Sequence, residues 1–62
     1  MAEKKNILIV DDDQELSDSI RVVLEKKGFN VIQARDGQQG KNLIYQRTPD
    51  LVILDTMMPR MG

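Results

Sequence analysis

The hydrophobic pattern of the chain alternates short apolar runs with longer amphipathic segments. Residues 7–10 (ILIV) are continuous, apolar and rich in β-branched side chains, which is typical of a strand buried on both faces. Residues 51–54 (LVIL) form a second run of this kind. Residues 29–34 (FNVIQA) set two apolar residues between polar neighbours, which indicates a more polar strand nearer a sheet edge. The pattern therefore predicts three strands.

The segment after the first strand predicts an amphipathic helix. Its N-cap is either Asp12 or Asp13, because both carry side-chain oxygens that accept hydrogen bonds from the first turn. Gly28 marks its end. The apolar residues recur at helical spacing and are expected to pack in the core. They are Leu16, Ile20, Val23 and Leu24.

The segment from about residue 38 to residue 47 predicts a second, weaker helix. Gly40 in its interior costs about 1 kcal/mol relative to Ala, and few apolar residues anchor the segment. Pro49 ends it, because proline disfavours helical geometry in the residue before it. The predicted order of elements is therefore β-α-β-α-β.

That order predicts an α/β fold with a parallel sheet, since parallel strands need helical crossovers between them. We expect one domain over residues 1–62, with the first strand between the second and the third. Two helices cannot cover three strands on both sides, and the apolar third strand is left as an open edge. We therefore expect a homo-oligomer, formed through that strand and the bare sheet face.

Composition narrows the available chemistry. The 62 residues contain no Cys and no His, which excludes disulfides, zinc sites built on these residues, and thiol or imidazole catalysis. Nine Lys and Arg against ten Asp and Glu give a net charge of −1, so no basic patch indicates direct binding to nucleic acid. Carboxylates are therefore the groups to follow.

The apolar runs are too short for a membrane. Each has four residues, whereas a spanning helix needs about 20. The run that follows Lys4 and Lys5 is also too short for the apolar part of a signal peptide. We expect a cytoplasmic protein.

Three acids follow the two most apolar strands. Asp11 and Asp12 come after the first strand, and Asp55 comes after the third. Ligands of parallel α/β sheets bind at the carboxyl ends of the strands, so we expect these carboxylates to converge there. Such a cluster favours a divalent cation, and Mg²⁺ suits an open site that shares its coordination with phosphate oxygens. A phosphoryl group is the expected guest.

These residues resemble a known family. Residues 7–13 (ILIVDDD), the glycine turns at 28–29 and 36–37, and residues 49–62 (PDLVILDTMMPRMG) are similar to the receiver domain of bacterial two-component response regulators. The resemblance covers essentially the whole chain. It implies the first half of a flavodoxin-like fold, without the fourth and fifth strands.

The resemblance also implies roles for individual residues. Asp55 corresponds to the aspartate that accepts phosphate from a histidine kinase or phosphotransfer protein. Asp11 and Asp12 correspond to the acid pair that holds Mg²⁺, and Met57 contributes its backbone carbonyl. The family also uses a Ser or Thr after the fourth strand and a Lys after the fifth, so we expect slow or absent transfer in 62 residues. The chain is not expected to be an enzyme beyond promoting its own phosphorylation.

Two other interpretations stay open. The chain is, alternatively, a half-domain that acts as a self-associating, homodimeric structural module without phosphotransfer. A third possibility is a simple binder of divalent cations. Asp13 is expected to be an N-cap rather than a ligand, because capping alone explains an acid at a helix start.

Overall fold

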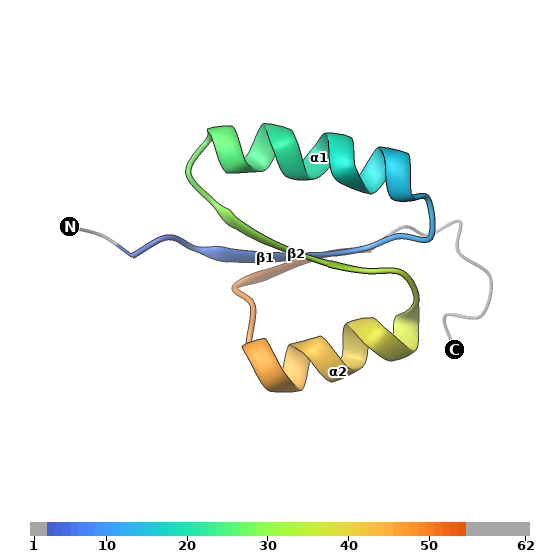
Figure 1. Ribbon diagram of the computed structural model, residues 1–62. Helices are drawn as coiled ribbons and strands as arrows, with labels where there is room; N and C mark the ends of the chain where they lie inside the picture. Colours follow the sequence, from blue (N-terminus) through green and yellow to red (C-terminus); the bar gives the residue numbers. More distant parts are fainter. Residues whose placement is uncertain (1–2, 55–62) are drawn as a thin grey trace.

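The computed structural model describes residues 3–54, which form a three-stranded sheet with one helix on each face (Figure 1). The sheet is parallel and its strand order is β2-β1-β3. The central position of the first strand was predicted from the sequence and is confirmed. The elements in chain order are β1 (Asn6–Val10), α1 (Gln14–Lys26), β2 (Asn30–Ala34), α2 (Gly37–Arg47) and β3 (Leu51–Leu54).

The first helix begins and ends as the sequence predicts. Asp13 is the N-cap, and its Oδ1 accepts a hydrogen bond of 3.1 Å from the backbone N–H of Leu16. At the other end Gly28 adopts φ +97°, and the N–H groups of Gly28 and Phe29 donate to the carbonyls of Glu25 and Leu24. This pairing satisfies carbonyls of the last turn, and it favours glycine because other residues rarely adopt a positive φ.

The second helix contains Gly40 because it lies very close to the central strand. Gly40 is buried, and a Cβ added there would lie 2.8 Å from Cγ2 of Val10. The sequence presents this glycine only as a weakness of the helix. The structure shows that the missing side chain allows α2 to approach β1.

The core lies between the sheet and α2. Leu8, Val10 and Ala34 are at most 2% exposed and form one cluster. The partly buried side chains packed against this cluster come from all three layers of that half of the molecule. They are Ile32, Leu43 and Val52.

The other face of the sheet carries the alternate residues of each strand. Ile9 is paired in register with Gln33 of β2 and with Ile53 of β3. Gln33 reaches α1 through its side chain, so this row of residues faces α1. Ile7 and Ile9 are buried on that face, as predicted for a strand covered on both sides.

The prediction that the whole apolar face of α1 packs in the core was wrong for two residues. Leu16 and Val23 are 50% and 52% exposed. The reason is geometric, because a helix about 10 Å wide covers about two strands spaced about 4.8 Å apart. Among the described elements α1 contacts only β2 and β1, and neither helix contacts β3.

Candidate functional site at the carboxyl edge of the sheet

Asp11 is the buried acid at the carboxyl end of the central strand. It is 5% exposed, and its backbone N–H donates to the carbonyl of Ala34 at 3.0 Å. One carboxylate oxygen, Oδ1, accepts a hydrogen bond of 2.8 Å from the backbone N–H of Asp13. This contact fixes the turn between β1 and α1, so the carboxylate is held in one orientation.

The next two acids have different roles. Asp12 is exposed and follows Asp11 directly, at the same edge. Asp13 uses Oδ1 to cap α1, which confirms the interpretation of this residue as an N-cap. The acid pair expected to hold a cation is therefore Asp11 and Asp12, one buried and one open to solvent.

The remaining predicted site residues, Asp55 and Met57, lie outside the described residues. The strand that leads to them is described, however: Leu54 is in parallel register with Val10, the residue before Asp11. Residues 3–54 alone contain no cluster of three or more acids that could hold a metal ion. A complete oxygen site therefore needs a ligand from outside that range.

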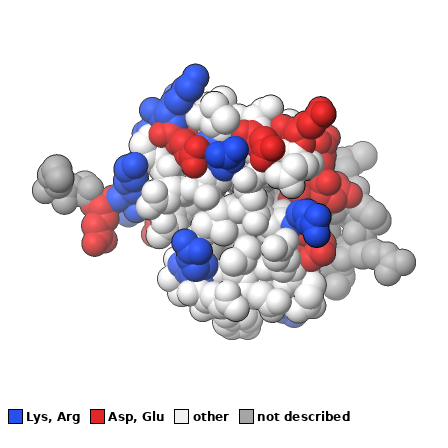
Figure 2. Space-filling model, in the orientation of Figure 1, with Lys and Arg blue, Asp and Glu red and all other residues white. Residues whose placement is uncertain are grey.

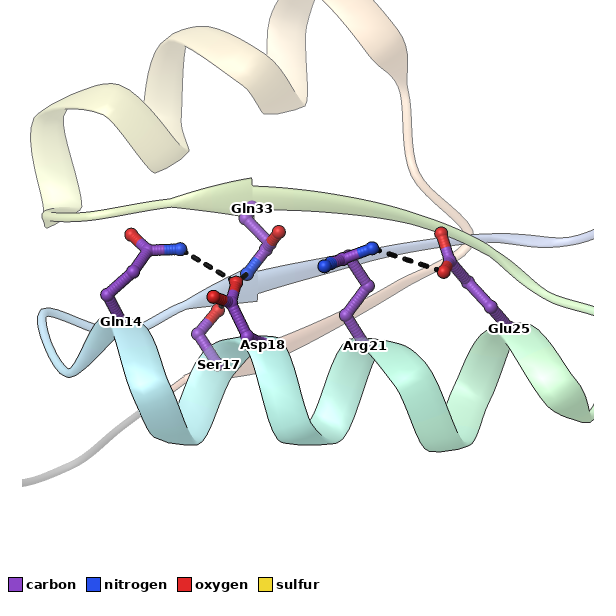
Figure 3. Close-up of polar contacts among 6 residues, drawn as sticks. All are labelled: Gln14, Ser17, Asp18, Arg21, Glu25 and Gln33. Carbon is purple, nitrogen blue, oxygen red and sulfur yellow. Dashed lines mark hydrogen bonds and ion pairs between the residues drawn. The ribbon is translucent and has the colours of Figure 1, made fainter.

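A polar cluster between α1 and β2 was not anticipated from the sequence (Figure 3). The Nε2 of Gln33 donates to Ser17 Oγ at 2.7 Å and to Asp18 Oδ1 at 2.9 Å. Gln14 donates to the same oxygen of Asp18 at 2.8 Å. The hydrogen bond from Gln33, then that from Gln14, lowers the pKa of the Asp18 carboxyl below its ordinary value, and the charge of Arg21 lowers it further.

We expect the Asp18 contacts to make stability pH-dependent in the acid range. Because the folded pKa is depressed, the stabilisation is present above the ordinary pKa of about 3.9 and is lost as pH falls through the folded value. The free energy of unfolding should therefore differ more between wild type and Asp18→Asn at pH 6 than at pH 3. Urea titrations at both pH values measure this. In a Gln33→Ala background the pH-dependent difference should shrink, and an unchanged difference would contradict the assignment.

Comparison with known proteins decides the family. The profile of the response regulator receiver domain matches residues 7–62. The chain belongs to this family. It is 50% identical over 54 residues to the transcriptional regulatory protein CpxR of Escherichia coli K12, and 48% identical over 54 residues to RpaA of Synechocystis, a DNA-binding dual master transcriptional regulator. Each match covers 87% of this chain, but only 23% and 22% of the relatives.

Solved receiver structures have the same arrangement. A response regulator receiver domain protein from Clostridium thermocellum superposes with a TM-score of 0.85 at 29% identity, over 90% of this chain and 46% of that one. The N-terminal domain of a Wolinella succinogenes protein gives 0.83 at 33% identity, over 94% and 47%. The receiver chain described here thus spans less than half the length of these structures. The half-receiver, flavodoxin-like prediction is confirmed.

The residues that sequence analysis missed at this receiver's α1–β2 interface left a weak signal. Gln33 is a polar residue at a strand position whose face is covered, and Ser17 lies beside the apolar helix stripe yet is 2% exposed. Each is unremarkable alone. Only their pairing across 16 positions of sequence explains both.

Proposed function

We propose that this receiver chain is a phosphoacceptor module in which Asp55 takes a phosphoryl group from a sensor histidine kinase or phosphotransfer protein. Mg²⁺ would be held by Asp11, Asp12, Asp55 and the backbone carbonyl of Met57. The observation that supports the proposal is the register of Val10 with Leu54. Asp11 and Asp55 are the next residues of these neighbouring strands, and consecutive Cα atoms are only about 3.8 Å apart.

The donor set fits a hard cation. Carboxylate and carbonyl oxygens are the ligands Mg²⁺ prefers, and an ion of this kind usually binds one or two carboxylates and keeps waters. When bound, the ion neutralises charge that develops on the transferring phosphoryl oxygens. The buried, oriented carboxylate of Asp11 supplies a fixed ligand, and the exposed Asp12 leaves one side of the site open to solvent.

The proposed reaction is nucleophilic displacement at phosphorus. A carboxylate oxygen of Asp55 forms the new O–P bond, and the P–N bond to the kinase histidine breaks. The imidazole leaves with the bonding electron pair and is protonated afterwards. The product is an acyl phosphate on Asp55, with no change of oxidation state.

Acetyl phosphate provides a test without the cognate kinase. Wild type incubated with acetyl phosphate and Mg²⁺ should gain one phosphoryl group in intact mass, and Asp55→Asn should gain none. Asp13→Asn is the matched control from the same acidic run, because Asn caps a helix about as well as Asp and the fold is preserved. It should still be modified. A folded wild type that gains no phosphate, or equal labelling of Asp55→Asn, would exclude the proposal.

A second candidate function is self-association, favoured by the exposure of β3. Leu51 and Leu54 are 55% and 50% exposed on an edge strand that no described helix covers. Large apolar side chains gathered on an edge strand favour pairing with another chain. Sedimentation over a concentration series tests this, and a folded monomer at every concentration would contradict it.

The remaining expectations about surroundings are consistent with these proposals. Between residues 3 and 54, neither helix has the length and apolar character required to cross a bilayer. Figure 2 shows Lys, Arg, Asp and Glu interspersed over the face that it presents, with no large patch of one sign there. A cytoplasmic location and the absence of direct nucleic-acid binding stay predictions for this chain.

A further inference from the structure

One flank of α1 and one face of β3 together form an apolar step. Asp18 bonds to Gln33 and thus marks the flank of α1 that faces β2 (Figure 3). At about 100° per residue, Leu16 and Val23 lie about 160° and 140° around the helix from Asp18. They are therefore on the opposite flank, which faces the β3 side of the sheet because β1 lies between β2 and β3.

The floor of the step is the face of β3 on the α1 side of the sheet. Leu51 and Ile53 are in register with Ile7 and Ile9, whose side chains face α1. Leu51 is 55% exposed and Ile53 is partly buried. The step is thus one helix wide, with an apolar wall on α1 and an apolar floor on β3.

We propose that this step binds the α1 helix of a second copy of the chain, with a twofold axis parallel to the strands; the proposal rests on the self-association candidate above. Such an axis turns the second sheet over, so that each α1 covers its own β2 and β1 and also the partner's β3. Two helices side by side then fill the layer between two sheets. A twofold axis perpendicular to the sheet would instead pair the two β3 edges.

The sequence of the wall suits contact with its own copy. Leu16, Ile20 and Val23 follow the 4-3 spacing of a helix seam, with the β-branched Ile20 at an a position and Leu16 at a d position, a combination that favours parallel helix pairs. The twofold axis proposed here makes the two helices parallel. Each wall residue then meets the same residue of the partner.

Charge and area support a second copy as the occupant. The acidic residues Asp18 and Glu25 lie on the far flank, about 140° to 180° from Leu16 and Val23, so identical walls meet without like charges between them. A specific interface takes about 800 Å² from each partner, roughly a sixth of the 4817 Å² that this chain exposes. Three wall side chains cannot supply that area alone, so the floor on β3 is needed as well.

Single cysteines test the geometry, because the chain has no thiol of its own. With glutathione disulfide as oxidant, Val23→Cys should form a covalent dimer at least about tenfold faster than Val22→Cys, since only position 23 meets its own copy at the seam. Val22 is the matched control: it is the preceding residue of the same helix and is 43% exposed. Leu54→Cys, on the opposite face of β3, should also cross-link slowly.

The outcomes separate this interface from self-association in general. A chain that sediments as a dimer but cross-links equally at positions 22 and 23, or fastest through Leu54→Cys, associates in another way and overturns the proposed seam alone. A folded chain that stays monomeric overturns both proposals. As a check without oxidation, Val23→Glu should weaken dimerisation more than about tenfold by burying an unpaired charge, and Val22→Glu should leave it unchanged.

Discussion

Leu8→Ala is expected to leave the chain largely unfolded at room temperature. Leu8 is fully buried in the central strand, at the centre of the cluster with Val10 and Ala34. Truncating such a leucine typically costs about 2–5 kcal/mol, because the cavity adds to the lost burial. A unit below about 70 residues rarely has more than about 3–5 kcal/mol to lose. Far-UV circular dichroism with urea titration measures the result.

Leu54→Ala is the matched control for that loss. It removes the same atoms from a side chain that is 50% exposed on β3, so its effect should be well below that of Leu8→Ala. Equal losses of free energy at the two positions would mean that the sheet centre is not the core in solution. A folded Leu8→Ala with near wild-type stability would mean the same.

Much of the fold was predictable because its local signals agree with one another. The apolar run at 7–10, the capping acid before α1 and Gly28 after it each specify an element by short-range physics. The sheet order followed from the parallel crossovers and was confirmed. Even the choice between Asp12 and Asp13 as N-cap was limited to adjacent residues, and the hydrogen bond to Leu16 resolved it.

What the sequence could not show depends on how elements meet. Helical periodicity placed Leu16 and Val23 on the apolar side of α1, but it cannot say how far across the sheet the helix reaches. The pairing of Ser17 with Gln33 likewise depends on the register of α1 over β2. For the site, residue order predicted that Asp11 and Asp12 follow the central strand, while the buried orientation of Asp11 required the turn geometry.

Gly40→Ala is expected to destabilise the chain by about 1–2 kcal/mol, although alanine is the better helix former. The substitution gains about 1 kcal/mol in helix propensity. Against this, the new Cβ would lie 2.8 Å from Cγ2 and 3.3 Å from Cγ1 of Val10, and overpacking of that kind typically costs about 1–3 kcal/mol or more. Urea titration of Gly40→Ala beside Asn42→Ala, an exposed position of the same helix, measures the difference.

Repeating Gly40→Ala in a Val10→Ala background isolates the contact. Removing both Cγ atoms of Val10 removes the two shortest approaches to the added Cβ, so the helix-propensity gain should then dominate. The effect of Gly40→Ala on the free energy of unfolding is therefore expected to change sign between the two backgrounds, with a coupling energy of about 1–3 kcal/mol. If Gly40→Ala stabilises both backgrounds equally, α2 does not approach β1 this closely, and Gly40 has no packing role. A sign reversal would mean that the glycine which weakens α2 as an isolated helix is what lets it cover the strand leading to Asp11.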